Sequence, residues 1–367
     1  MKIGSVYTGR SMSQPVLYNN LTRDIEAEMI LFNDGSENMD HFNFEYKYHH
    51  HQVSDYEIGG QTALWASQYR LRKKWRKYLK KQIDSDFDLL IGMNELATPT
   101  IDAAGTYNIP SLFFIRSLDI TGQEMYRSRR SHIKNFLNAD FGARTQYPFL
   151  VRNFKEYKRG MKKADIVVSN SEYVSKRLKE DFNVDSEVIY PPITLERFKV
   201  DNDEDGYIAM VNPRNTEKGG DIFFDIAESM PSEDFISAGV FRNKQLERRC
   251  ENIDNLTHIG WCDDMKKLYR QAKLVLVPSR WNEAFGRVAA EAMVSGIPCV
   301  VSNRGGLPEI VGKTGEIVEE IESIPVWQDA IERALSNHNP EAQMRRVKRF
   351  SAEKQNKKFK RVINSIT

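Results

Sequence analysis

Hydrophobic and polar positions along this chain of 367 residues follow the rhythm of an α/β protein. Short apolar runs predict buried strands in the first half, at 3–7, 27–32, 42–48, 87–92 and 111–115. The second half repeats the pattern, with apolar runs at 207–211, 235–240, 258–261, 274–277 and 297–302. Stretches with helical spacing separate many of these runs. Strands that alternate with helices favour parallel sheets made of βαβ units.

The segment 274–302 shows this rhythm most fully. An apolar run ends at Pro278, and helix formers with apolar residues at helical spacing then extend over 284–295. Gly296 and Pro298 follow, where a helix is expected to stop. A second apolar strand comes next, so the segment predicts two parallel strands joined by a helix.

Two glutamates, Glu283 and Glu291, bracket the first part of that predicted helix. Eight residues of helix span about 12 Å, which is roughly the reach of a sugar nucleotide from its hexose to its ribose. A carboxylate can accept hydrogen bonds from two neighbouring hydroxyls at either end, and the peptide N–H groups of Phe285, Gly286 and Arg287 favour phosphates between them. The alternative is a solvated helix that carries two surface glutamates.

Length and charge point to a two-domain globular enzyme. The chain is long enough for two domains of about 150 to 200 residues. The acidic, aperiodic segment 201–206 predicts the linker, which gives domains at 1–200 and 207–349. A formal net charge of +2 and a charged fraction of 28% give no argument for nucleic acid as a partner.

The cysteines, the histidines and the first residues allow predictions of the cellular location, of metal binding and of membrane insertion. The three cysteines show no CxxC or Cys/His spacing, which predicts a reducing, cytoplasmic location. The adjacent histidines at 49–51 cannot all face one metal from a regular strand, so a solvated strand end is the simpler interpretation and we expect no metal site. No basic segment leads into a long apolar run near the first residue, and no apolar run reaches about 18 residues, so we expect neither a leader peptide nor a membrane span.

A basic amphipathic helix is predicted over 61–83. Its part at 69–81 holds eight Lys and Arg and no acid, and its apolar stripe consists of Leu71, Trp75, Tyr78 and Leu79. One interpretation is a core-facing stripe with a solvated basic face. The other is a surface for an anionic membrane or a polyanionic acceptor, on a protein that associates peripherally with the inner face of the membrane. Further basic segments occur at 127–134 and 155–163.

Several linked motifs carry a family resemblance. In order along the chain they are Glu283-Ala-Phe-Gly, Glu291-Ala-Met, Gly296-Ile-Pro and Gly305-Gly-Leu-Pro-Glu309. Together they resemble the nucleotide-sugar motif, with two glutamates separated by seven residues, of retaining glycosyltransferases of the GT-B type, family four. The resemblance implies two Rossmann-like domains with parallel sheets that face a cleft. It also implies that the second domain binds the donor, that the first binds the acceptor, and that a helix at about 350–367 returns to complete the first.

The resemblance assigns a donor site to the second domain. Lys218 and Arg214 would hold the diphosphate, although the family spacing puts the arginine at Pro213, one position earlier. Glu283 would contact the transferred sugar and Glu291 the ribose. The remaining donor contacts are expected at Phe285, Gly286, Arg287, Val288 and Trp261, where the tryptophan lies just past a strand and is available for stacking on the base.

The acceptor side falls in the first domain. We expect contacts from Gly9 and Arg10 in the loop after the first strand, where the family usually has more glycines. Arg116 takes the position at which the family commonly has a histidine, which suggests a charged donor sugar or an acceptor phosphate. Ser171 belongs to a segment, Ala164 to Tyr173, that also resembles the family.

The predicted activity is transfer of a hexosyl-type residue from a nucleotide diphosphate sugar, with retention and without a metal or other cofactor. Lys218, Arg214 and the helix start near Glu283 would offset the diphosphate charge that a magnesium ion otherwise meets. A glycan, lipid-linked or polyanionic acceptor in cell-surface polysaccharide or glycoconjugate synthesis is expected. The alternatives are a nucleotide-sugar 2-epimerase and a non-catalytic sugar-nucleotide-binding protein. The nucleotide base, the sugar, the acceptor and the oligomeric state stay open.

Overall fold

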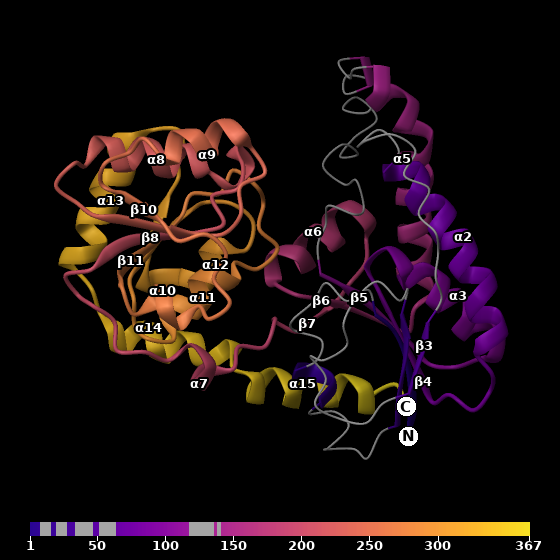
Figure 1. Cartoon of the computed structure of the whole chain (residues 1–367). Coiled ribbons are helices and arrows are strands. Elements are labelled where there is room, and N and C mark those ends of the chain that lie inside the picture. The colour runs from indigo at the N-terminus through magenta and orange to yellow at the C-terminus, as the bar shows by residue number, and fades with distance from the viewer. Residues whose placement is uncertain (8–15, 20–27, 34–46, 51–63, 117–135, 138–140) are drawn as a thin grey trace. The chain divides into compact units, whose positions relative to one another are not determined.

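The computed structural model divides the protein into two compact units (Figure 1). Unit 1 comprises 1–190 and 355–367, and unit 2 comprises 191–354. The structure describes residues 1–7, 16–19, 28–33, 47–50, 64–116, 136–137 and 141–367.

A parallel sheet forms the centre of unit 1. Its strands are β1 (Lys2–Tyr7), β2 (Glu28–Asn33), β3 (Lys47–His50), β4 (Leu89–Met93), β5 (Ser111–Ile115), β6 (Ile166–Ser169) and β7 (Glu187–Val188). Their order across the sheet is β3-β2-β1-β4-β5-β6-β7, and each recorded pairing is parallel. The strands β4 and β5 are buried along their whole length, as expected for a parallel sheet covered on both faces.

Helices cover both faces of this sheet. Their bounds are α2 (Leu64–Gln82), η2 (Asn94–Leu96), α3 (Ala97–Tyr107), α5 (Phe141–Lys163), α6 (Glu172–Phe182) and α15 (Ala352–Asn364). Trp75 and Leu79 of α2 pack on one face of the sheet with Leu90, whereas Phe359 and Ile363 of α15 pack on the other. The sequence prediction that the stripe of the basic helix faces a core is therefore confirmed.

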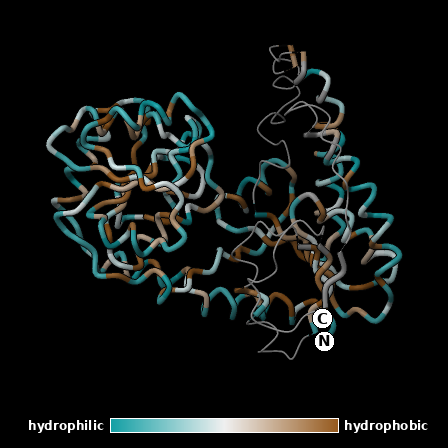
Figure 2. The backbone as a smooth tube through the Cα atoms, viewed as in Figure 1, coloured by the Kyte–Doolittle hydropathy of each residue, from teal (hydrophilic) through white to brown (hydrophobic). Residues whose placement is uncertain are grey.

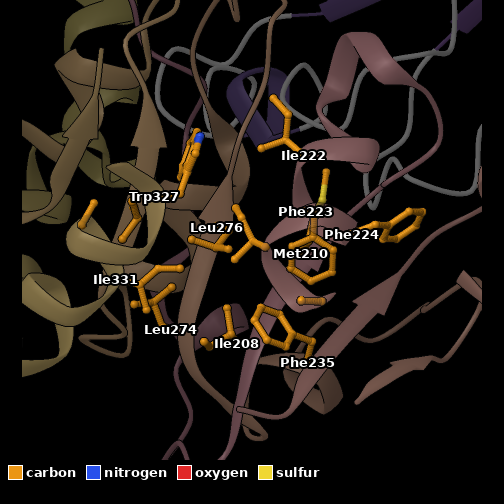
Figure 3. Close-up of a cluster of buried hydrophobic side chains, with 14 of the residues drawn as sticks. Ile208, Met210, Ile222, Phe223, Phe224, Phe235, Leu274, Leu276, Trp327 and Ile331 are labelled. Carbon is orange, nitrogen blue, oxygen red and sulfur yellow. The ribbon is translucent and has the colours of Figure 1, made fainter. Parts of the chain in front are cut away.

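Unit 2 has a second parallel sheet. Its strands are β8 (Tyr207–Val211), β9 (Phe235–Ala238), β10 (Leu256–His258), β11 (Ala272–Val277), β12 (Cys299–Ser302) and β13 (Glu316–Val318), in the order β10-β9-β8-β11-β12-β13. Figure 3 shows how Phe223, Phe235, Leu276 and Trp327 fill the core beside these strands. The indole N–H of Trp327 donates to the carbonyl of Ile321 at 2.9 Å, so this buried donor is satisfied.

Short helices surround that sheet. They are α7 (Leu195–Phe198), η5 (Thr216–Lys218), α8 (Gly220–Ser229), α9 (Lys244–Cys250), α10 (Lys266–Tyr269), α11 (Arg287–Met293), α12 (Leu307–Val311), η6 (Gly312–Thr314), α13 (Ile324–Ser336), α14 (Pro340–Val347) and η7 (Lys348–Phe350). In Figure 2 the hydrophobic colour concentrates along the strands and the hydrophilic colour along the outer helices. The apolar runs of the sequence therefore became the sheets, and the amphipathic stretches became their covers.

Both sheets have the strand order of a doubly wound Rossmann-like fold. When the strands of each unit are numbered along the described chain, their order across the sheet begins 3-2-1-4-5-6. Such a sheet binds ligands beyond the carboxyl ends of its strands, next to the point where the order reverses. That point lies between β1 and β4 in unit 1 and between β8 and β11 in unit 2. The predicted fold class, two Rossmann-like units with parallel sheets, is confirmed.

The predicted helix over 284–295 is too long at its start. The structure begins α11 at Arg287, because Gly286 has a φ of 100°, which lies outside the helical region. Glu283 therefore lies in the loop before the helix. The estimate of about 12 Å between the two glutamates assumed eight helical residues, and that assumption is wrong.

The end of the chain contains a helix close to the one predicted at about 350–367, with two shorter helices before it. It is divided into α14, η7 and α15, because Ser351 leaves the helical conformation and pairs with Ile193 in an isolated parallel bridge. The contact division falls after Tyr190, whereas the sequence placed the linker at 201–206. Val200 is held within unit 2 by a 2.9 Å bond from its N–H to Ser295 Oγ.

The described residues bear on the membrane and metal predictions in two ways. None of the helices in those ranges combines the length and the apolar character that crossing a membrane requires. The same ranges contain no group of three or more His, Cys, Asp and Glu side chains arranged to hold a metal ion. His51 of the histidine run lies outside the described residues.

Candidate active site

The loop after β8 brings Lys218 to the carboxyl edge of the second sheet. Asn215 caps the short helix η5 by accepting the N–H of Lys218 at 3.1 Å. Gly219 follows with a φ of 76°, and a Cβ there would lie 1.9 Å from the carbonyl oxygen of Pro278. Only glycine fits this close approach, so the loop is fixed against the segment that follows β11.

Backbone hydrogen bonds connect this loop to the segment 279–283. The N–H groups of Arg280 and Trp281 both donate to the carbonyl of Glu217 at 3.0 Å. The guanidinium of Arg280 donates to the carbonyl of Thr216 at 2.7 Å and also pairs with Asp221 at 2.7 Å. These contacts fix the loop that carries Lys218, and the sequence offered no motif that singled out Arg280.

Arg280 is anchored at its other edge as well. It forms two 2.6 Å bonds with the carboxylate of Glu322. The hydrogen bonds to Glu322 raise the pKa of Arg280 above its ordinary value, with a further contribution from Asp221. A bidentate pair of this kind defines an orientation as well as a charge contact.

Lys218 and Glu283 meet at the centre of the site. Lys218 Nζ lies 2.5 Å from Glu283 Oε1, although the two residues are 65 positions apart in the sequence. Ser279 Oγ lies 3.2 Å from the same oxygen. The backbone of Glu283 is held as well, since its carbonyl accepts the N–H of Gly306 at 2.6 Å and a Cβ on Gly305 would lie 2.1 Å from it. Both side chains stay partly exposed, so the pair remains open to a ligand.

Arg214 lies in the same loop with an unused hydrogen-bond donor. Its Nε is buried and has no hydrogen-bond partner among the described residues, while its carbonyl accepts the N–H of Arg242 at 3.0 Å. A buried donor without a partner is uncommon and is a natural position for a ligand oxygen. The sequence placed this arginine one residue away from the family spacing, and the structure does put it in the loop that leads to Lys218.

Glu291 occupies a different environment from Glu283. It is only 6% exposed, and its carboxylate accepts the hydroxyl of Tyr269 at 3.0 Å and Arg287 Nε at 2.5 Å. Burial raises the pKa of Glu291, and the nearby charge of Arg287 opposes that shift. Burial also raises the pKa of Tyr269 well above its ordinary value. Both carboxylate oxygens therefore have partners in the structure, and Tyr269 was not found by sequence reasoning.

The other residues predicted to contact the donor differ in how far they are exposed to solvent. Phe285 is buried and packs edge-on against Phe350, with ring centroids 5.3 Å apart, so only its backbone is left for a ligand. Gly286 is buried, and Arg287 and Val288 are partly exposed. Trp261 is 70% exposed, and its indole N–H donates to Asp263 at 2.5 Å. Its ring is therefore available for stacking, and donor contact there stays a prediction.

The predicted acceptor residues are not brought together in the same way. Gly9 and Arg10 lie outside the described residues. Arg116 directly follows β5, and its carbonyl accepts Asn170 Nδ2 at 2.6 Å. Ser171 is fully buried, and its hydroxyl caps α6 by accepting the N–H of Val174 at 3.1 Å. Acceptor contact at Ser171 stays a prediction, for a hydroxyl that already accepts one hydrogen bond within the protein.

Comparison with known proteins finds a family match for a segment of unit 2. Residues 193–350 match the model of the family described as Glycosyl transferases group 1. This segment belongs to that family. The family resemblance expected from the two glutamates and the glycine turn is confirmed.

Curated relatives match this chain over part of their length. Spore coat protein SA of Bacillus subtilis (strain 168) is 32% identical over 131 residues, which are 32% of this chain and 35% of that protein. D-inositol 3-phosphate glycosyltransferase of Mycobacterium sp. (strain JLS) is 28% identical over 200 residues, which are 47% of this chain and 45% of that protein. The chain thus spans about a third to a half of the length of these relatives.

Solved structures share the fold of the whole chain. Sucrose-phosphate synthase from Thermosynechococcus elongatus has a TM-score of 0.75 at 17% identity and covers 100% of this chain and 98% of that one. HepE from Anabaena, solved in complex with UDP-glucose, has a TM-score of 0.66 at 16% identity with full coverage of both chains. These likenesses confirm the GT-B fold class.

Proposed function

We propose that this protein is a glycosyltransferase that moves a hexosyl-type residue from a nucleotide diphosphate sugar to a glycan, lipid-linked or polyanionic acceptor. The observation that carries the proposal is the contact between Lys218 and Glu283 inside the segment of the group 1 family. A cation and a carboxylate held side by side match a donor that presents a diphosphate next to sugar hydroxyls. The UDP-glucose complex of HepE makes UDP-sugars the first donors to test.

Lys218 and Arg214 are assigned to the diphosphate. The bond between the anomeric carbon and the phosphate oxygen breaks, and negative charge develops on that oxygen. A lysine at the edge of the sheet and an arginine whose Nε has no partner among the described residues offset this charge as it forms. We propose that these two cations do the work that a magnesium ion would otherwise do, so that transfer proceeds without a metal or another cofactor.

Glu283 is assigned to the sugar. Its Oε1 contacts Lys218 and Ser279, and its carboxylate is partly exposed, so it can accept hydrogen bonds from sugar hydroxyls. We propose transfer with retention. The acceptor hydroxyl attacks the anomeric carbon on the face from which the phosphate departs, and its proton passes to the departing phosphate oxygen. No carboxylate base is needed for that route.

Glu291, Arg287 and Trp261 complete the assignment of the donor. Glu291 would receive the ribose by exchanging part of its contact with Arg287, whose side chain is about one-third exposed and so can move into solvent. Trp261 would stack on the base. Arg116, at the end of a strand in unit 1, is assigned to the acceptor, and we place the reaction in the cytoplasm, at the inner face of a membrane when the acceptor is lipid-linked.

A donor panel tests the proposal directly. UDP-, GDP-, ADP- and dTDP-sugars are screened by thermal shift, and the donor that stabilises the protein is then assayed for slow hydrolysis without acceptor, with and without EDTA. We expect one nucleotide to stabilise the protein and hydrolysis to persist in EDTA. Hydrolysis that stops with Glu283→Gln, while the free nucleotide still stabilises the variant, supports the assigned roles.

The same assay separates the alternatives. Stabilisation without hydrolysis or transfer under any condition would show a binding protein. Inversion at C2 of the sugar, followed by NMR of the donor, would show an epimerase. Activity that disappears in EDTA and returns with magnesium would overturn the metal-independent mechanism.

A further inference from the structure

The helices α2, α3 and α5 of unit 1 concentrate positive charge far beyond that of the whole chain. α2 holds eight Lys and Arg and no acid, α5 holds seven with one acid, and α3 holds one acid, which gives the three helices a net charge of +13. The whole chain has a formal net charge of +2. We propose that the exposed faces of α2 and α5, with the apolar end of α5, form a docking surface for an anionic membrane.

The acids of these helices are used internally. Arg76 bonds to Asp102 and to Glu156 at 2.8 Å each, and Arg159 bonds to Asp102 at 2.6 Å. These bonds join α2, α3 and α5 into one packed layer. The desolvation of Asp102 is offset by Arg159 and Arg76, which lower the pKa of that carboxyl. Both acids of the three helices are therefore committed to contacts between the helices rather than to their outer faces.

Two of the eight cations of α2 do not belong to the docking surface. Arg72 is 1% exposed, donates to Asn153 Oδ1 and lies over the ring of Tyr157, so it is part of the core between the helices. Arg76 is committed to its two acids. The other cations are exposed and define the basic part of the surface: Arg70, Lys73, Lys74, Lys77, Lys80 and Lys81 of α2, and Arg152, Lys155 and Lys162 of α5.

An apolar end lies at the start of α5. Leu137 is 61% and Phe141 is 84% exposed, and Phe136 is also exposed. Arg144 donates to the carbonyls of Phe136 and Leu137 at 3.1 and 2.5 Å, and its guanidinium lies over the ring of Phe136. Exposed aromatic and aliphatic side chains beside arginine are typical of proteins that insert into the interfacial region of a bilayer.

On α5, the exposed residues Phe141, Arg152, Lys155 and Lys162 lie on one helical stripe, and α2 runs beside α5 in the same direction. Tyr69 contacts Phe149 and Arg152, and Arg72 contacts Asn153 farther along both helices. Figure 1 shows α2 and α5 side by side over this part of their length. Cations alone would also bind a soluble polyanion. The exposed apolar residues favour a membrane, because a soluble polyanion offers nothing that would bury them.

This inference deepens the proposed function, because a lipid-linked acceptor has to be met at a membrane surface. The test is co-sedimentation with vesicles of phosphatidylglycerol and phosphatidylcholine, and with vesicles of phosphatidylcholine alone, at low and high salt. We expect binding only to the anionic vesicles and weaker binding at high salt, because salt screens the attraction.

Three variants sharpen the experiment. The charge variant changes Lys73, Lys77, Lys155 and Lys162 to Gln, and the apolar variant combines Leu137→Ser with Phe141→Ser. The control variant removes four exposed cations of unit 2 by changing Lys244, Arg248, Lys267 and Lys313 to Gln. A cation near an anionic surface contributes about fivefold to binding, so the charge variant should bind at least about tenfold more weakly. The apolar variant should lose roughly tenfold, and the control should bind like the parent.

Each outcome decides between supporting and overturning the proposal. Equal sedimentation of the parent and the charge variant, or an equal loss in the control, overturns it. A soluble polyanion would be the ligand instead if three results came together. The charge variant would bind weakly, the apolar variant would bind like the parent, and polyphosphate would compete fully with the vesicles. Thermal melting shows that each variant is folded. Vesicle binding without donor hydrolysis would refute the proposed function alone, and hydrolysis without vesicle binding would refute the docking surface alone.

Discussion

The two units share one strand order, yet their charges have opposite signs. Unit 1 carries 31 Lys and Arg against 24 Asp and Glu, and unit 2 carries 22 against 27. In unit 1 the cations gather on the outer faces of helices. In unit 2 cations such as Lys218 and Arg280 lie at the edge of the sheet and are held by acids. The same strand order is therefore combined with cations on outer helix faces in unit 1 and with ion-paired cations at the sheet edge in unit 2.

The carboxyl ends of the strands show the difference at single residues. After β8 and β11, Lys218 and Glu283 are brought to 2.5 Å by a loop that Gly219, Arg280 and Gly306 fix. After β6 of unit 1, the hydroxyl of Ser171 is buried and caps the following helix. Both sheets have the same strand order and so the same kind of carboxyl edge. The side chains at that edge determine whether it forms a ligand site.

The largest effect is expected from Lys218→Ala. Loss of a charge-assisted phosphate contact costs about 1.5 to 3 kcal/mol, so kcat/KM should fall roughly tenfold to hundredfold. Donor hydrolysis without acceptor should fall by the same factor, because the lysine acts on the leaving diphosphate. Steady-state kinetics of both reactions measure the change.

Arg116→Ala is the matched variant in unit 1. It should lower transfer to the acceptor and leave donor hydrolysis unchanged, because Arg116 belongs to the other unit's strand end. If both variants lower hydrolysis equally, the division between donor and acceptor units is wrong.

Arg214→Ala should lower kcat/KM by about tenfold. A buried Nε without a partner among the described residues is assigned to a phosphate oxygen, and its loss removes one charge-assisted hydrogen bond. Arg242→Ala is the control, since the hydrogen bond of Arg242 to Arg214 is made by its backbone N–H, which the substitution keeps. A fully active Arg214→Ala enzyme would show that Lys218 holds the diphosphate without it.

Arg280→Ala should lower kcat by about fivefold and change KM little, because the variant loosens the loop of Lys218 without removing a ligand contact. It should also lower the free energy of unfolding by about 1 to 2 kcal/mol. Arg280→Lys, which keeps the charge but loses the bidentate contact, should recover part of kcat.

Arg333→Ala is the control for Arg280→Ala. It breaks a similar pair, with Glu316 at 3.0 Å, at an exposed position away from the loop. Its kcat should match the parent, and its stability should fall by less than about 1 kcal/mol. A fall in kcat equal to that of Arg280→Ala would mean that the effect is general rather than positional.

Glu291→Gln is expected to give the smallest change in activity, a loss of nucleotide affinity of about threefold to fivefold, since an amide can still bond to ribose hydroxyls. The stability of the parent protein should depend on pH in the opposite way from that expected of a paired surface glutamate, whose pKa is lowered. Burial raises the pKa of Glu291, so the folded protein keeps a proton that the unfolded chain has lost, and stability falls as pH rises through that range.

The variant lacks this titration. The melting temperature of the parent relative to Glu291→Gln should therefore fall from acid to neutral pH, as scanning fluorimetry can follow. A difference that stays constant over this range would contradict the raised pKa.

The sequence by itself determined the local elements and the family. Apolar runs marked strands such as β5 and β11, because a strand buried on both faces is apolar throughout. The two glutamates and the glycine turn after β12 identified a group 1 glycosyltransferase segment. Such motifs can be found because the residues that form them are close together in the chain.

Tertiary structure alone decided which side chains meet. Lys218 and Glu283 are 65 positions apart, and the loop that carries Lys218 is bound by Arg280, whose partners Thr216 and Glu322 come from separate segments. Periodicity marked the basic helix but could not show that Arg72 is buried between two helices, because that depends on Asn153 and on the packing of α5. Nor could it place the start of α11, which Gly286 sets through its positive φ. Spacing describes neighbours along the chain, whereas a site is made by neighbours in space.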